Sequence, residues 1–593
     1  MDIQFFQKIG GGFCIESVKM IKSMKKYIVK ILICIGVLLL MSDCNRLDNS
    51  FDIVVYGGSP AGIAAAIQAK EMGKRVILIA PEGRIGGLTT SGLGATDMGN
   101  KKKYIGGLAR TFYRKVKDYY FNDPSAWKQE SLQEFQDHAL KKGIDEDAMW
   151  FFEPHVAYEI YTRMLEEAGV EVILSERLDL REGIGVQKKD SHISGIQMES
   201  GKIYRAKIFI DATYEGDLMA KAGVSYMVGR ESNDQYGETL NGIQLFETYY
   251  NLHLFARKVD PYKIKGDPDS GLIFGIQESG LPGENGEGDH RVQAYCFRLC
   301  LTDVPENQVP FPKPENYDPA HYELLLRYIH SKEKFPWVPQ ERADTIENMV
   351  LGWNPTRLMM PNRKTDSNTR GPISFNFVGG NYNYPDGDYA ERKRIVEAHK
   401  NWQQGLIWFL AHDPRIPAEF SEPIKKWGLA RDEFMNNDNW PPQLYIREAR
   451  RMVSDYVMTE KNCTGERIAE NSVGLASYPM DSHICSRYVH TDGWVRNEGH
   501  IGIGVKQPYP VSYQSIVPRE EECSNLLVPV CLSASHAAYG SIRMEPVYMM
   551  LGQSAGIAAA IAIDDGLSIQ AVDYQKLSKL LIENDQVLQW EEK

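Results

Sequence analysis

The stretch from Asp52 to Ala80 constrains the fold more than any other part of the chain. It opens with the apolar run DIVVY, breaks at the turn GGSPAG (57–62), and continues as an alanine-rich segment that stops near Gly73. The apolar run predicts a buried parallel strand, and the alanine-rich segment predicts a helix. Arg75 to Ala80 is then the second strand, so the stretch is typical of a βαβ unit.

The turn in this unit is suited to a dinucleotide. A helix N-terminus carries unpaired backbone N–H groups and the positive end of the helix dipole, which together can hold a pyrophosphate. Pro60 suits the first helical turn because its missing N–H would have no partner there. The predicted cofactor contacts in the turn are Gly57, Ser59, Pro60, Ala61 and Gly62.

Two residues depart from the usual fingerprint G-x-G-x-x-G. Ser59 replaces the middle glycine and narrows the approach of the phosphates. Ala80 replaces the acid that holds a ribose hydroxyl at the end of the second strand, and Glu82 is the nearest candidate to take over that role. An ordinary βαβ turn without a ligand therefore stays open as an alternative.

The loop after the second strand favours FAD over NAD. It reads GRIGGLTT, and its doublet lets backbone amides approach the ribose and phosphates of FAD in large flavoproteins. The predicted contacts here are Gly86, Gly87, Leu88 and Thr89.

Two later motifs are expected to return to the same cofactor. Short alternating runs from Leu178 to Lys207 predict an antiparallel meander, and a strand ending in Asp-Ala-Thr follows it. Near the C-terminus, the residues RMEP (543–546) lead into a helix from about Val547 to Ile563, whose N-terminus would stabilise the reduced flavin ring. The predicted contacts are Asp211, Ala212, Thr213, Gly216, Asp217, Arg543, Glu545 and Pro546.

Together, runs such as VVYGGSPAGIAAAI, GRIGGLTTSGLG, IDATYEGDLMAKAG and SASHAAYGSIRMEPVYMM resemble a bacterial FAD-dependent oxidoreductase family. The flavin domain of that family is similar to that of the flavin-containing subunit of heterodisulfide reductase. The resemblance implies an α/β, glutathione-reductase-like FAD-binding Rossmann domain, with a parallel sheet plus a β-meander and a large inserted α+β substrate domain. We accordingly expect the FAD domain at 51–228 and 519–593 and the substrate domain at 229–518. Exported members are often encoded among carbohydrate-degrading genes, which suggests a sugar-derived substrate.

Residues 1–50 are expected to be a leader segment. Several lysines precede the apolar run Ile31 to Met41, which has the length of a signal-peptide core and is too short to span a bilayer. Cys44 follows and suggests a lipid anchor, although Asp43 before it fits that role poorly. We therefore expect a bacterial protein that is exported, either periplasmic or held at the membrane as a lipoprotein.

Composition excludes several other classes. The formal net charge of −12 over 593 residues argues against nucleic acid as a partner. Nine cysteines without a C-x-x-C run support neither a disulfide scaffold nor an iron–sulfur cluster. Buried free thiols are expected instead, and no metal site is predicted.

The expected reaction moves a hydride from a small substrate to the flavin while a protein base takes a proton. His536, one turn before the RMEP entry, is the first candidate base and His483 the second, since the ordinary pKa of histidine lies near neutral pH. For each histidine taken singly, the alternative is a structural or solvent-exposed side chain, which is the commoner role of a histidine. Arg447, on a predicted helix from Tyr445 to Thr459, could hold an anionic or hydroxylated substrate, or lie on a solvated basic face.

Three functions stay open on the sequence alone. The first is an FAD oxidoreductase that passes electrons to an unidentified acceptor. The second is a hydrolase or lyase whose flavin is structural or used transiently. The third is a carbohydrate-binding surface protein on a degenerate flavin fold, which Ser59 and Ala80 would suggest if they abolished binding.

Overall fold

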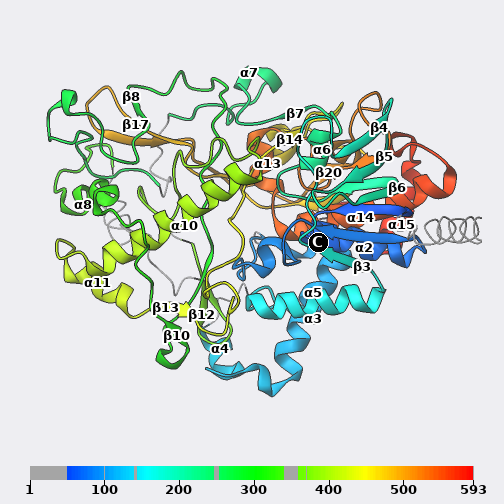
Figure 1. The fold of residues 1–593 in the computed structure, drawn as a ribbon, viewed down its shortest axis with the longest axis horizontal. Coiled ribbons are helices and arrows are strands. Elements are labelled where there is room, and N and C mark those ends of the chain that lie inside the picture. The colour runs from blue at the N-terminus through cyan, green and yellow to red at the C-terminus, as the bar shows by residue number, and fades with distance from the viewer. Residues whose placement is uncertain are drawn as a thin grey trace, which may run out of the picture. The chain divides into compact units, whose positions relative to one another are not determined.

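A seven-stranded sheet contains the strands of the predicted βαβ unit and of the predicted meander (Figure 1). The computed structural model describes residues 50–98, 101–138, 143–245, 253–338, 358–368 and 370–591, and Phe51–Lys593 form one compact unit. The strands of the seven-stranded sheet run in the order β3-β2-β1-β6-β5-β4, with β21 beside β6. Their bounds are β1 Ser50–Tyr56, β2 Val76–Ala80, β3 Glu171–Leu174, β4 Val186–Lys189, β5 His192–Gln197, β6 Ile203–Asp211 and β21 Leu526–Leu527.

The sheet confirms the predicted opening unit and the predicted meander. Strand β1 pairs parallel with β2, which pairs parallel with β3, and the short β21 pairs parallel with β6. Strands β4, β5 and β6 pair antiparallel. The helix between β1 and β2 is α2 (Pro60–Glu71), and α5 (Pro154–Ala168) leads into β3. The chain is therefore a mixed α/β structure with a parallel sheet.

The two faces of this sheet belong to different hydrophobic cores. Successive side chains of a strand point to opposite faces. Ile53 and Val55 of β1 accordingly pack with the residues of α2, while Val54 and Tyr56 pack with the meander. Helices α3 (Gly107–Asn122) and α5 contribute to the first core.

Helix α14 (Glu545–Asp565) packs directly on α2, whereas its small residues were expected to lie against the sheet. A Cβ added at Gly552 would lie 2.1 Å from the carbonyl oxygen of Ala61, and one at Gly556 would lie 2.6 Å from that of Ala65. Only glycine permits so close an approach of two backbones. Helix α14 is apolar and long enough to cross a membrane, but 94% of its most apolar window is buried inside the protein.

The region after residue 228 adds a mixed set of elements (Figure 1). A five-stranded sheet runs in the order β10-β13-β9-β12-β11. Helix α10 runs from Tyr389 to His412. Further elements after residue 228 are α8 Glu323–His330, α11 Ala418–Lys425, α13 His536–Ile542, β9 Leu299–Thr302, β10 Gln308–Val309, β11 Met359–Met360, β12 Lys364–Ser367, β13 Gly428–Ala430, β14 Arg451–Met452 and β16 Met480–Ser482.

Some local predictions in this region are wrong. The run from Tyr445 to Thr459 is not a helix but irregular chain around the two-residue strand β14. Its apolar spacing was misleading because Arg447, Arg450 and Arg451 are buried rather than exposed on a helix face, and tertiary ion pairs hold Arg450 and Arg451. The four-residue spacing of Cys296 and Cys300 would put both on one face of a helix, but Cys300 lies in β9. The six cysteines among the described residues are free and buried, as expected. The division into domains at 228 and 518 stays a prediction.

Candidate functional site

Three segments far apart in the sequence meet at the carboxyl end of β1. Ser59, the N-cap of α2, donates a hydrogen bond of 2.6 Å from its Oγ to the carbonyl of Ala212, directly after β6. A Cβ added at Gly57 would lie 2.4 Å from the carbonyl carbon of Ala212. Glycine is therefore required at position 57, and the serine that replaces the middle glycine is a structural partner of the second motif.

The loop that holds the glycine doublet Gly86–Gly87 contacts the segment after β6 and the start of α14. Gly86 and Gly87 have φ values of 88° and 50°, which favour glycine. The hydroxyl of Tyr214 accepts a hydrogen bond of 3.1 Å from the Leu88 amide and donates one of 2.9 Å to Glu545 Oε1. Thr89 Oγ1 lies 3.5 Å from Glu545 Oε2. The loop after β2, the segment after β6 and the N-terminus of α14 are thus linked through side chains.

The turn at 57–62 fits a dinucleotide pyrophosphate. In the first turn of α2 the Gly62 amide is bound by Ser59 Oγ, Pro60 has no N–H, and the Ala61 amide has no partner within the helix. A Cβ at Gly62 would lie 2.0 Å from the Gly57 carbonyl, so the turn is too tight for another residue. A phosphate group can therefore approach the backbone of the turn and the N-terminus of α2.

Asp211 and Asp217 hold the second segment in shape rather than presenting free carboxylates. Asp211 accepts hydrogen bonds from the Thr213 amide (3.0 Å), the Thr213 hydroxyl (2.7 Å) and the Met219 amide (2.8 Å). The Gly216 amide donates to Thr213 Oγ1 at 3.0 Å. Burial raises the pKa of Asp211 to about 6. The predicted role of Asp211 in binding the cofactor stays a prediction.

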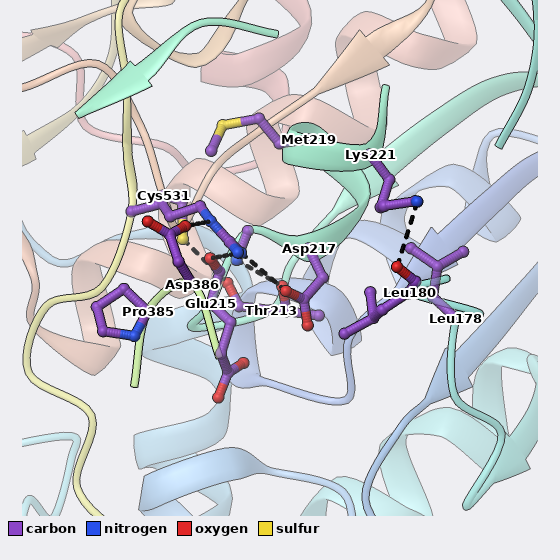
Figure 2. Close-up of polar contacts among 12 residues, drawn as sticks. Leu178, Leu180, Thr213, Glu215, Asp217, Met219, Lys221, Pro385, Asp386 and Cys531 are labelled. Atoms are coloured by element: carbon purple, nitrogen blue, oxygen red, sulfur yellow. Dashed lines mark hydrogen bonds and ion pairs between the residues drawn. The ribbon is translucent and has the colours of Figure 1, made fainter. Parts of the chain in front are cut away.

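Two arginines from the region after residue 228 contact the carboxylate of Asp217, which lies near Glu215 and Asp386 (Figure 2). Arg392 of α10 contacts its two oxygens at 2.6 and 2.8 Å, and Arg450 contacts Oδ1 at 2.8 Å. Arg450 also reaches the Glu215 carbonyl at 3.1 Å and Asp386 at 2.9 Å. Against the opposing effect of burial, these guanidinium groups lower the pKa of Asp217. Asp217 therefore anchors α10 to the segment after β6.

Glu82 and Glu545 are carboxyl groups with raised pKa values near this junction. Burial, then the neighbouring charge of Glu215, raises the pKa of Glu82 to about 8. Burial raises the pKa of Glu545 to about 8 as well, although Tyr214 and Thr89 donate to it. Both groups are neutral near pH 7 in the protein as described. Pro546 lies in the first turn of α14, as predicted.

His536 is held by a buried carboxylate. Its Nδ1 lies 2.8 Å from Glu448 Oε2, and Glu448 also accepts from Gln293 Nε2 at 2.8 Å and pairs with Arg451 Nε at 2.7 Å. His536, next to these partners, lowers the pKa of Glu448 to about 2 despite its burial. Within the described chain, His536 Nε2 is buried and has no hydrogen-bond partner.

His483 is connected to the same network. Its backbone amide donates to Gln293 Oε1 at 3.1 Å, while Asn376 Nδ2 lies 3.0 Å from its Nδ1. Its Nε2 lies 3.6 Å from Asp481 Oδ2. Burial, followed by the charge of Arg447, lowers the pKa of His483 well below its usual value. Gln293 thus bridges the two histidines that the sequence singled out.

Arg447 lies in a group of three guanidinium groups around the ring of Tyr445. The guanidinium carbons of Arg447, Arg298 and Arg543 lie 4.7, 5.7 and 6.0 Å from the ring centroid. Arg543 also donates to the Tyr445 hydroxyl at 3.0 Å and pairs with Asp481 at 2.8 Å. The three residues predicted as catalytic therefore lie in one buried polar cluster.

A group of possible metal ligands elsewhere is already neutralised. Glu153, His155 and Glu433 lie close enough together to share an ion. The ammonium of Lys364 lies 2.6 Å from Glu153 Oε1 and 3.0 Å from Glu433 Oε1, and it supplies the positive charge. This group is explained as a buried ion cluster.

Sequence reasoning missed Glu448, Gln293 and Tyr445. Glu448 stands beside Arg447 in the run YIREARRM, so an acid between basic residues was the available signal. Nothing in the sequence marks Gln293 or pairs it with a histidine 190 positions later.

Residues 52–581 match the family model described as FAD dependent oxidoreductase. No curated protein matches the chain. Among solved structures, THI4 of Thermovibrio ammonificans is 16% identical with a TM-score of 0.20, covering 34% of this chain and 74% of its own. L-amino acid deaminase of Proteus vulgaris is 16% identical with a TM-score of 0.22, covering 31% and 53%. L-proline dehydrogenase of P. horikoshii is 15% identical with a TM-score of 0.21, covering 30% and 58%. These TM-scores are too low to carry an inference about function.

Proposed function

Because the chain belongs to the FAD dependent oxidoreductase family, we propose that it uses FAD to oxidise a small organic substrate at a carbon bearing a hydroxyl or amine. FAD supplies the chemistry of hydride acceptance when it is bound. The glycine turn at 57–62, the doublet Gly86–Gly87 and the N-terminus of α14 would hold it, since these three segments converge. The substrate loses a hydride and a proton, and the chain's own task is to take the proton.

The pairing of His536 with Glu448 carries this proposal. A carboxylate that accepts from Nδ1 fixes the neutral imidazole with its proton on Nδ1 and its lone pair on Nε2. Nε2 is the atom left without a partner in the described structure. A buried histidine oriented in this way is prepared to act as a base, and Gln293 holds Glu448 in place.

Replacement of His536 tests the proposed base. We expect His536→Gln to slow reduction of the bound flavin by substrate roughly 10²–10⁴-fold while leaving flavin content unchanged. The measurement is anaerobic bleaching of the flavin with a panel of sugars, hydroxy acids and amines. His399→Gln is the matched control, since His399 of α10 is also buried but, among the described residues, its ring bonds the Ile395 carbonyl and no carboxylate. Equal rates in the two variants would rule out His536 as the base.

The finer identity of the protein is also a proposal. We infer from the sequence a glutathione-reductase-like domain similar to that of the flavin-containing subunit of heterodisulfide reductase, a sugar-derived substrate and an unidentified electron acceptor. We likewise propose that the protein is bacterial and exported, and that Cys44 carries a lipid anchor. Cys44 lies outside the described residues. Mass spectrometry of the mature N-terminus would test the anchor: unmodified Cys44 in a longer chain would exclude it.

A further inference from the structure

Buried arginines in the described chain are in general paired with carboxylates. Arg230 pairs with Asp289 and Glu498, Arg298 with Asp366, Arg451 with Glu231 and Glu448, and Arg543 with Asp481. The pairing is physically required because an isolated buried charge loses its hydration without compensation.

Arg447 departs from this rule. It is 1% exposed, and its guanidinium donates only to the Ala294 carbonyl and, from Nη2 at 3.2 Å, to the sulfur of Cys296. Its Nε is buried and has no hydrogen-bond partner among the described residues. No carboxylate among the described residues forms an ion pair with Arg447. Arg447 is therefore a buried cation whose Nε–Nη2 edge is not matched by an acid.

The neighbouring Arg298 shows what that edge accepts. Arg298 Nε and Nη2 each lie 2.6 Å from one oxygen of Asp366, the two-point geometry of a guanidinium–carboxylate pair. Arg298 and Arg447 face the same Tyr445 ring. A carboxylate of a ligand could accept hydrogen bonds from Nε and Nη2 of Arg447, as Asp366 does from Arg298.

The surroundings place this group beside the proposed chemistry. His483 lies close enough to Arg447 that the guanidinium charge lowers the pKa of its imidazole, as does burial. Glu448, the next residue, orients His536. Arg543 bonds the Tyr445 hydroxyl and lies two residues before Glu545 at the N-terminus of α14.

We propose that Arg447 binds the carboxylate of a monocarboxylate substrate. The inference rests on the proposed oxidoreductase function and names the substrate class of the same site. It narrows the substrate to small acids that carry a hydroxyl or amine group, including sugar acids, and it excludes neutral sugars as preferred substrates.

Titration of the FAD-loaded enzyme with sodium acetate tests the proposal, with acetamide as the neutral isostere and sodium chloride and phosphate at equal ionic strength. We expect acetate to raise the Tm and to perturb the flavin absorption saturably, while the other solutes do neither. Arg447→Met should abolish both effects, and Arg447→Lys should weaken acetate binding at least about tenfold. Phosphate or acetamide acting as strongly as acetate would overturn the assignment.

Two controls separate a binding role from a structural one. Arg487 is also buried without a carboxylate, but Asn497 Oδ1, the Gly275 carbonyl and the Pro372 carbonyl satisfy its donors at 2.8–2.9 Å. Arg487→Lys should therefore keep the acetate response. In the absence of ligand, Arg447→Met should not lower the Tm as Arg298→Met does, because the charge it removes has no carboxylate partner among the described residues. Acetate binding by Arg447→Met, or a Tm loss as large as that of Arg298→Met, would refute the proposal.

Failure of this inference differs from failure of the proposed function. Protein that holds FAD and is reduced by substrate, but ignores acetate, would refute only the carboxylate assignment. Protein that takes up no FAD would refute the function, and the Tm titration with acetate would still report on Arg447.

Discussion

At the scale of single residues, the site is built from buried polar groups whose partners are fixed. Glu448 serves His536, Gln293 and Arg451 at once, and Glu545 joins Tyr214 and Thr89. Such groups are expensive to bury unless every partner is in place. The cost of burying a charge also shifts the pKa values of these groups, and it raises the pKa of Glu545.

Glu545 should make the protein less stable as pH rises. Its pKa of about 8 in the folded protein exceeds the ordinary 4.5, so the folded state keeps a proton that the unfolded state releases. This contribution is full below pH 4.5 and is lost on the way to pH 8, on the order of 4 kcal/mol. Glu545→Gln keeps an acceptor for the Tyr214 hydroxyl and should remove that loss.

Chemical denaturation of the two proteins between pH 5 and pH 8 would measure it. The variant should gain stability relative to the parent as pH rises. Glu419→Gln, on the exposed surface of α11, is the control and should show no such trend. A constant difference across the range would mean that Glu545 is already ionised in the folded protein.

At the scale of elements, α10 connects the region after residue 228 to the cofactor segments. Its Arg392 contacts both oxygens of Asp217, and both residues are buried. Arg392→Met would leave a buried carboxylate with only Arg450, so we expect a loss of about 3–5 kcal/mol in the free energy of unfolding.

The same helix offers the matched control. Arg394 pairs only with Glu391, and its side chain is 69% exposed. Arg394→Met should change stability by about 0–1 kcal/mol, as is usual for surface pairs. Equal losses in the two variants, measured by urea denaturation, would contradict the role given to Asp217.

At the scale of the whole molecule, stability should be greatest near pH 6.5. Burial lowers the pKa of four histidines, so stability that they contribute is lost as pH falls below about 6.5. These are His253, His399, His483 and His500. Glu433 and Glu448, with pKa values of about 2, lose their contribution as pH falls below about 4.5. Asp211 acts in the opposite direction up to about pH 6, and Glu82 and Glu545 do so up to about pH 8.

Thermal unfolding from pH 4 to pH 9 would test this balance. Between pH 4.5 and 6.5 the histidines should prevail, so the Tm should rise with pH. Above pH 6.5 only the two raised carboxyl groups still titrate in this set, so the Tm should fall. A Tm that keeps rising to pH 8 would show that the charges of Glu82 and Glu545 are compensated in the folded protein.

The cofactor half of the protein could be predicted from the sequence because its signals are local. A strand, a glycine turn and a small-residue helix are contiguous from Asp52 to Glu71, and each is specified by neighbouring residues. Helix α14 was predictable from Gly552 and Gly556, whose missing side chains are needed wherever two backbones touch. The prediction for the run from Tyr445 to Thr459 failed because its apolar spacing resembles that of a helix, while Arg450 and Arg451 are held by acids distant in the sequence.

The sequence by itself therefore determined the βαβ opening, the meander, FAD as the cofactor and the residues worth suspecting, since periodicity, turn chemistry and motif spacing are properties of short segments. Only the tertiary structure decided that His536 has a carboxylate partner, that Asp217 is held by two arginines, and that Arg447 forms no ion pair with a carboxylate of the described residues. The physical reason is that a buried charge is governed by the groups around it in space, and those groups come from segments hundreds of residues apart.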